Sequence, residues 1–390
     1  MDRKDFKSTE AGRIVRASGG YLAFVPAPLP PSFDYDAGLV RLLSEADAAL
    51  SELAGLGRNL PNPRLLIAPY VRREAVLSSR IEGARASIAD VLMHERANET
   101  AAGDISGDVR EVRNYVTALE YGIRRLGSLP LSLRLVQELH QRLMRGVRGN
   151  SATPGEFRRS QNWIGSPGST LESAIFVPPP PEALMDVLGE WERFLHVRET
   201  FPDLVQCALA HEQFEAIHPF LDGNGRVGRL LVMLFLVERQ RLPQPLLYLS
   251  EYLEAHRQDY YDLLQRCRTH GEWIPWLRFF LTGVRDTANE ARERARRLMD
   301  LREKWRKELR SSANALSLLD DLFLNPYVTV AYAQSVLKVS NPTARQVVVR
   351  MQEAGLLKEV TGRAWGRLYV AEPVLHVIEG AAKSRRKASK

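Results

Sequence analysis

The stretch His218-Pro-Phe-Leu-Asp-Gly-Asn-Gly-Arg-Val-Gly-Arg229 combines a histidine, a carboxylate, three glycines and two arginines within twelve positions. Residues 204–217, just before it, carry apolar side chains at helical spacing, and Pro219 ends that helix because proline cannot continue the hydrogen-bond ladder. The apolar run 230–237, just after it, is too short for the roughly 20 residues that a bilayer requires, and it predicts a buried helix. The sequence therefore predicts a loop between two helices, at the start of the second.

The residues of this loop are those needed to bind phosphates and to move a proton. Amides at a helix start favour a bound anion, and glycines let a ligand approach them. Arg226 and Arg229 are three apart and share a helix face. Asp222 offers an oxygen ligand that suits Mg²⁺, and His218 has an ordinary pKa suited to a general base. A plain turn at a helix end is the alternative, and the coincidence of all these residue types favours a functional site.

The same residues match, at every specified position, the signature of the Fic family, His-x-Phe-x-Asp/Glu-Gly-Asn-Gly-Arg-x-x-Arg. Other segments also resemble bacterial Fic proteins that carry an N-terminal helical region. They are Pro154-Gly-Glu-Phe-Arg158, Ala174-Ile-Phe-Val-Pro178, Tyr248-Leu-Ser-Glu-Tyr-Leu253 and Gly271-Glu-Trp-Ile-Pro-Trp-Leu-Arg-Phe-Phe280. The resemblance extends over residues 20–370 and implies a mainly α protein with a Fic-type helical core and a small β-hairpin flap.

The resemblance also implies an activity, the transfer of AMP from ATP to a Ser, Thr or Tyr hydroxyl of a target protein. His218 would take the hydroxyl proton, Asp222 would hold Mg²⁺, and Arg229 would hold the γ-phosphate. The remaining residues that the resemblance assigns to ATP are Gly223, Asn224, Gly225 and Arg226 at the phosphates and Tyr260, Tyr261 and Leu264 near the adenine. Aromatic residues at helical spacing are most often part of a core, so the last three remain open.

A second pattern, Ser78-Ser-Arg-Ile-Glu-Gly83, lies far upstream in a segment that predicts a helix from Pro69 to about Glu95, interrupted at Gly83. Ser78 and Glu82 are four apart and share a face. The pattern resembles the inhibitory Ser/Thr-x-x-x-Glu-Gly/Asn of the family, whose glutamate pairs with the second arginine of the signature, here Arg229. An ordinary surface glutamate is the alternative.

Residues 161–181 are rich in Gly, Ser and Pro, with a short apolar stretch at Ile175, Phe176 and Val177. The segment predicts a hairpin with an exposed edge that can accept an extended peptide as an added strand. In Fic proteins this position is the flap that aligns the target. Without the resemblance the segment predicts only a β-turn loop.

Residues 313–375 follow the order of a winged helix. Helices are expected at 313–324, 331–337 and from an N-cap at Asn341 to Gly355, with a strand at 328–330 and a wing over 357–370. DNA binding through the third helix and the wing is one interpretation. A docking or dimerisation module is the other and is favoured, because the basic charge is modest.

The predicted divisions are an N-terminal helical region 1–110, a catalytic core 111–283, a connecting helix 284–312, the winged helix 313–375 and a disordered basic tail 376–390. With 54 Lys and Arg against 47 Asp and Glu, the net charge is +7, which does not by itself indicate nucleic acid. Cys207 and Cys267 are expected as buried thiols. Neither a signal peptide nor a membrane segment is recognisable, so a cytoplasmic protein with no membrane partner is expected.

Two other functions remain open from the sequence. One is a Fic-fold enzyme that transfers phosphate or another nucleotide moiety. The other is a DNA-binding regulator whose Fic site only senses nucleotide. The complete set of signature residues favours AMP transfer over both. The target protein, self-modification and a homodimer stay undetermined.

Overall fold

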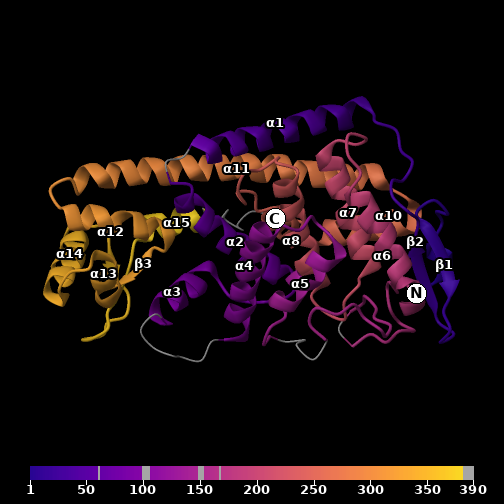
Figure 1. Cartoon of the computed structure of the whole chain (residues 1–390), viewed down its shortest axis with the longest axis horizontal. Coiled ribbons are helices and arrows are strands. Elements are labelled where there is room, and N and C mark those ends of the chain that lie inside the picture. The colour runs from indigo at the N-terminus through magenta and orange to yellow at the C-terminus, as the bar shows by residue number, and fades with distance from the viewer. Residues whose placement is uncertain (60–61, 99–105, 148–152, 167, 381–390) are drawn as a thin grey trace, which may run out of the picture.

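The computed structural model describes residues 1–59, 62–98, 106–147, 153–166 and 168–380, and the fold is mainly helical (Figure 1). The chain opens with a 3₁₀ turn (Arg3–Asp5) and two strands, β1 (Gly12–Arg16) and β2 (Leu22–Pro26). Five helices follow: α1 (Ala37–Asn59), α2 (Arg64–Ile81), α3 (Ile88–Asn98), α4 (Gly107–Arg125) and α5 (Leu133–Leu143). The next six are α6 (Pro181–Leu195), α7 (Asp203–Ile217), α8 (Asn224–Glu238), α9 (Ser250–Ala255), α10 (Arg257–His270) and α11 (Trp273–Glu308).

The C-terminal module, residues 313–380, contains α12 (Ala313–Leu324), β3 (Tyr327–Thr329), α13 (Val330–Leu337), α14 (Asn341–Glu353), β4 (Lys358–Glu359), β5 (Leu368–Val370) and α15 (Glu372–Glu379). Its strands form an antiparallel sheet in the order β3-β5-β4. The predicted helices and strands of residues 313–370 are all present. The cap of α14 is Ser340, whose hydroxyl accepts from the amide of Thr343, and not Asn341 as expected.

Two predicted divisions differ from the structure. The first residues are not helical, because β1 and β2 pair as an antiparallel hairpin in which Ile14 faces Phe24. The supposed tail begins inside a helix, since α15 continues to Glu379; residues 381–390 lie outside the described part of the chain. The expected connecting helix is the second half of α11, which starts at Trp273.

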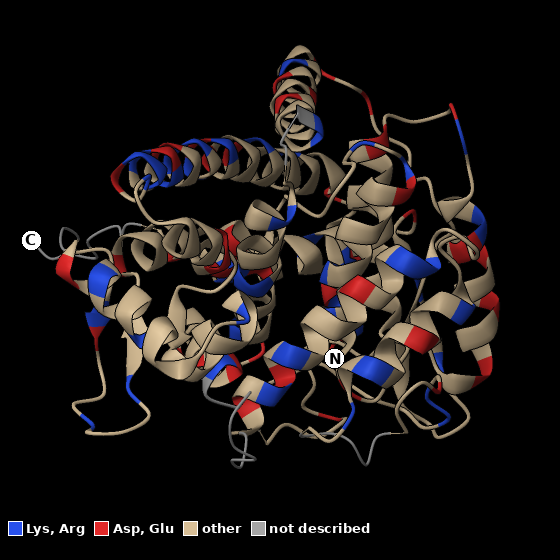
Figure 2. Ribbon diagram, turned by 60° about the vertical axis from the view of Figure 1, so that its left-hand side comes forward, with Lys and Arg blue, Asp and Glu red and all other residues tan. Residues whose placement is uncertain are grey.

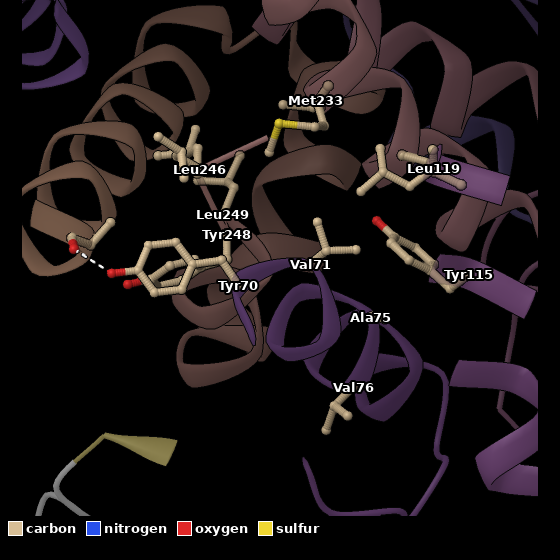
Figure 3. Close-up of a cluster of buried hydrophobic side chains, with 14 of the residues drawn as sticks. Tyr70, Val71, Ala75, Val76, Tyr115, Leu119, Met233, Leu246, Tyr248 and Leu249 are labelled. Atoms are coloured by element: carbon tan, nitrogen blue, oxygen red, sulfur yellow. Dashed lines mark hydrogen bonds between the residues drawn. The ribbon is translucent and has the colours of Figure 1, made fainter. Parts of the chain in front are cut away.

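The helix α2 lies in the centre of the molecule. Tyr70 and Val71 point into a cluster with Tyr248, Leu249 and Met233, as Figure 3 shows. The hydroxyl of Tyr70 donates to the carbonyl of Ala291 on α11 at 2.8 Å. The helix begins at Arg64 and not at Pro69, which sits inside it, and the expected break at Gly83 is present. Core packing on several sides thus outweighs the cost of one proline in the helix.

The long helix α11 spans the molecule, with α1 packed along it (Figure 1). Charged residues crowd its C-terminal half, from Arg285 onward (Figure 2). Cys207 and Cys267 are buried free thiols, as expected. Among the described residues, no helix combines the length and apolar character needed to cross a membrane.

Candidate active site

The signature loop is a closed turn between α7 and α8. His218 ends α7 in a left-handed conformation (φ 49°), and Gly223 (φ 78°) precedes α8. The side chain of Asn224 bonds both backbone groups of Phe220: Oδ1 accepts from its amide and Nδ2 donates to its carbonyl, each at 2.8 Å. Asn224, which the resemblance assigns to the phosphates, therefore braces the loop with its side chain. The first amides of α8 have no acceptor within the helix, which suits an anion.

Three residues to which the sequence assigned no role hold this loop from outside. The Nδ1 atom of His140 accepts from the amide of Gly155, so its Nε2 donates to the carbonyl of Asp222 at 3.0 Å. The His140 ring also stacks on Phe220, with centroids 3.7 Å apart. Arg158 and Asn162 donate to backbone carbonyls of the loop, among them that of His218. Burial lowers the pKa of His140 to about 4, so it is neutral at pH 7 and keeps this tautomer.

His218 is prepared as a base. Its Nδ1 lies 3.3 Å from the carbonyl oxygen of Glu215, which can only accept, so Nδ1 carries the proton and Nε2 has a free lone pair. Burial, and then the nearby charge of Arg268, lower the pKa of His218 to about 4. The imidazole is therefore neutral near pH 7, the form in which it can accept a proton.

Arg229 is bound by the C-terminal end of α2. Its Nε donates to the hydroxyl of Ser78 at 2.9 Å, and its Nη2 donates to the Ser78 carbonyl at 3.0 Å and to Glu82 Oε1 at 2.7 Å. Its side chain is only 2% exposed. Burial alone would raise the pKa of Glu82, but the charge of Arg229 holds it below its ordinary value. A phosphate that used these same donors, Nε and Nη2, would have to displace Ser78 and Glu82.

Arg226 also faces a carboxylate from the N-terminal half of the chain. Its Nη1 lies 3.3 Å from Glu111 Oε2 on α4, and both side chains are almost completely buried. Its Nη2 contacts the sulfur of Met144. Both arginines of the signature are therefore neutralised by glutamates, one on α2 and one on α4. Glu111 was not predicted, because no pattern in the sequence relates it to a residue so far along the chain.

Comparison with known protein families finds two matching domains in the chain. Residues 40–124 match the domain described as Fic/DOC family N-terminal, and residues 130–236 match the domain described as Fic/DOC family. The first match includes Ser78 and Glu82, and the second includes the whole signature loop. The chain carries a Fic/DOC N-terminal domain followed by a Fic/DOC domain.

Curated relatives of this Fic chain include a protein named protein adenylyltransferase Fic from Aedes aegypti. It is 33% identical over 151 residues, which cover 38% of this chain and 27% of the relative. The protein of the same name from Culex quinquefasciatus is 32% identical over 151 residues, covering 38% and 27%. This chain thus spans about a quarter of the length of the curated relatives it matches.

Two solved Fic structures share the fold. A Fic family protein from Desulfovibrio desulfuricans aligns with a TM-score of 0.57 at 20% identity, covering 88% of this chain and 98% of its own. A Fic-1 chain from C. elegans aligns with a TM-score of 0.50 at 20% identity, covering 65% and 71%. At this identity the likeness concerns the fold alone.

The predicted metal ligand of the Fic signature, Asp222, is exposed at the mouth of the loop. Its Oδ1 accepts from the amide of Gly223 at 2.6 Å. Among the described residues, no group of three or more His, Cys, Asp or Glu side chains is arranged to hold a metal. A lone exposed carboxylate fits an ion such as Mg²⁺, which takes most of its remaining ligands from substrate phosphates and water.

The three residues expected near the adenine differ in accessibility. Tyr260 is 1% exposed, and its hydroxyl lies 2.9 Å from Nε2 of His211, a partner that the sequence did not suggest. Leu264 is equally buried, and both belong to the core. Only Tyr261 has an accessible ring, at 40% exposure. Tyr261 is therefore the one residue of the three whose side chain is open to a ligand.

The flap is more covered than the sequence suggested. Ile164 forms an antiparallel bridge with Phe176, and the amide of Phe24 on β2 donates to the carbonyl of Val177 at 2.9 Å. Phe176 and Val177 are buried beneath the N-terminal hairpin, whereas Ile175 is 58% exposed. The expected exposed edge is wrong for Phe176 and Val177, because β2 occupies it.

Glu215 is a buried carboxylate beside the active-site histidine. Its Oε1 atom has no hydrogen-bond partner, and the side chain packs against Gly228. Burial raises the pKa of Glu215 to about 7. In the unfolded chain its pKa is near the ordinary glutamate value, so between pH 4.5 and 7 the native state holds a proton that the unfolded state has lost. Stability therefore falls as pH rises through this range.

Replacing Glu215 with glutamine should remove this loss of stability with rising pH. We compare the free energy of unfolding of Glu215→Gln with that of the parent protein at each pH. This difference should change by about 3 kcal/mol in favour of Glu215→Gln between pH 4.5 and pH 7.5, at 1.36 kcal/mol per pKa unit. Urea unfolding at several pH values measures it. Glu212→Gln is the comparison: burial raises the pKa of Glu212 as well, but Glu212 pairs with the buried Arg268, so losing its charge should destabilise the fold at pH 7.5. A pH-independent effect of Glu215→Gln would contradict the assignment.

Proposed function

We propose that this chain is a protein adenylyltransferase that moves AMP from ATP to a Ser, Thr or Tyr hydroxyl of a protein, and that Glu82 inhibits it. One observation carries the proposal: a neutral histidine with a free Nε2 lies in a loop that also presents a carboxylate, the first amides of a helix and two arginines. The names of the relatives from Aedes aegypti and Culex quinquefasciatus support the same activity.

The reaction follows from these groups. The target hydroxyl oxygen attacks the α-phosphorus of ATP while its proton passes to Nε2 of His218. The bond from the α-phosphorus to the bridging oxygen breaks, and pyrophosphate leaves. The amides at Gly223–Gly225 and the guanidinium of Arg226 stabilise the charge on the phosphate oxygens. Asp222 would hold Mg²⁺, which neutralises charge on the α- and β-phosphates.

The inhibition follows from the donors of Arg229. A γ-phosphate bound there would fix the α-phosphorus opposite the attacking hydroxyl. Glu82 occupies this guanidinium with a charge-assisted bond, and its carboxylate also lies against Gly225, so it competes with the phosphate for the same place. ATP can then bind only in a displaced position.

Labelling from two forms of ATP tests the activity. The Glu82→Gly variant is incubated with a cell lysate, Mg²⁺ and either α-³²P-ATP or γ-³²P-ATP. We expect label that depends on His218, in lysate proteins and in this chain if it modifies itself, from α-³²P-ATP only. Label from γ-³²P-ATP alone would instead indicate phosphate transfer and overturn the proposal. A parallel reaction with Glu82→Gly/His218→Ala identifies any label that contaminating enzymes add.

A further inference from the structure

The inhibitory helix α2 is also held by the C-terminal module. Both α12 and α15 pack against α2. Arg73, which is 9% exposed, donates from Nη1 to the carbonyls of Ile378 and Glu379 in the last turn of α15. The same guanidinium makes a bidentate pair with Glu251 on α9, at 2.6 and 3.1 Å. One side chain of α2 therefore joins the module to the Fic core.

This contact is specific in its chemistry. The last carbonyls of a helix lack partners within it and carry partial negative charge, and a guanidinium satisfies both needs. Gly380, the cap of α15, lies close to two guanidinium groups. A Cβ atom at this position would lie 3.2 Å from Nη2 of Arg73 and 2.8 Å from Nη2 of Arg294. The end of α15 therefore sits tightly on Arg73.

Beyond Arg73, a row of polar side chains on α2 bonds to neighbouring elements as far as the active site. Glu74, the next residue, is buried and accepts from the hydroxyl of Tyr115 on α4 and from the amide and hydroxyl of Ser250 on α9. Ser78 and Glu82 follow on the same face at intervals of four residues and bond to Arg229. Arg73 and Glu82 are nine residues apart on this helix, a distance of about 14 Å.

The contact between α2 and the C-terminal module also contains a cavity, which leaves room for these helices to move. A cavity of about 130 Å³ lies between α2, α11 and α12, lined by Leu66, Leu298 and Phe323 among others. Helices that border such a space can move relative to one another at lower cost than fully packed ones. A small displacement of α15 or α12 would therefore be carried along α2 to its far end.

We propose that Arg73 positions the inhibitory helix, and that the C-terminal module sets the strength of the block through it. A partner that binds the module and pulls α15 away from Arg73 would loosen the hold of Glu82 on Arg229. Arg73 touches none of the reacting groups, so it acts only through Glu82. This inference rests on the proposed function.

A double-mutant experiment tests it. Arg73→Met keeps most of the apolar stem and removes the bonds to α15 and Glu251. We expect it to raise labelling from α-³²P-ATP about 5-fold when Glu82 is present, and to change labelling less than 2-fold in the Glu82→Gly background, since effects that act through one residue are not additive. Arg72→Met is the matched control, because the hydrogen bonds that the structure describes for Arg72 go to Glu95 on α3 and to the carbonyl of Ala68, and none goes to the module. It should change labelling in neither background.

Equal effects of Arg73→Met in the two backgrounds, or lower labelling in both, would overturn the inference, because a merely structural residue would behave in that way. Gly380→Ala approaches the same contact from the module and should reproduce the result if Arg73→Met does not fold. Should Glu82→Gly itself give no label, the proposed reaction fails, and ATP affinity measured by calorimetry becomes the readout. Tighter ATP binding caused by Arg73→Met only when Glu82 is present would then still support the coupling.

Discussion

Replacing Glu82 with glycine is expected to raise the rate of AMP labelling by about 10- to 100-fold at saturating ATP. The carboxylate makes a charge-assisted hydrogen bond with a guanidinium that is 2% exposed, and such bonds contribute about 1.5–3 kcal/mol. At 1.4 kcal/mol per factor of ten, losing this competitor shifts ATP toward the productive position by the stated factor. Initial rates of label incorporation from α-³²P-ATP measure the effect.

Two variants show whether the charge or the volume of the Glu82 side chain causes the inhibition. Glu82→Gln keeps the shape of the side chain and removes its charge, so it should raise the rate by less than the glycine variant. Ser78→Ala removes one donor–acceptor contact of Arg229 and leaves the Glu82 pair in place, so a rise below 3-fold is expected. An unchanged rate in Glu82→Gly with ATP saturating would show that Glu82 does not control the site.

Much of the active-site loop could be predicted from the sequence because its contacts are local. The helix break at His218 and the start of α8 lie within twelve positions, whereas the bond between Asn224 and Phe220 was not expected. The groups that support the loop come from distant segments. His140 and Glu111 lie 82 and 115 positions from their partners Asp222 and Arg226, and nothing in the spacing relates them.

The fold shows the same limit. In the C-terminal module the helix α12 could be predicted to the residue, because a serine cap and an asparagine end bound its apolar repeat. The N-terminal hairpin was missed although the sequence carries its signal, Ser18-Gly19-Gly20 between two short runs of β-favouring residues. That omission also explains the wrong expectation for the flap, whose edge β2 covers. The start of α2 was placed too late because Pro69 suggests a first turn, whereas packing in the core extends the helix to Arg64.

Replacing His218 with alanine in the Glu82→Gly background is expected to lower AMP labelling by about 10²- to 10⁴-fold, the usual contribution of a positioned general base. The proton of the target hydroxyl would have no acceptor, because the free Nε2 is lost while the loop keeps its support from Asn224 and His140. ATP affinity should change less than 3-fold, since no phosphate contact is assigned to this side chain. Labelling rates and calorimetry on the same samples separate the two quantities.

The pH dependence gives this prediction an independent check. A base with a pKa of about 4 is active when deprotonated, so the labelling rate of a protein that keeps Glu82 should rise as pH increases through about 4 and stay level from pH 5.5 to 8. The charge of Glu82 raises the pKa of His218, so its removal moves the rise to still lower pH. His218→Ala should lose this acid limb together with most of the rate. Labelling by the double variant as fast as by Glu82→Gly, or a limb near pH 6.5, would mean that another group takes the proton or that the histidine is solvated during the reaction.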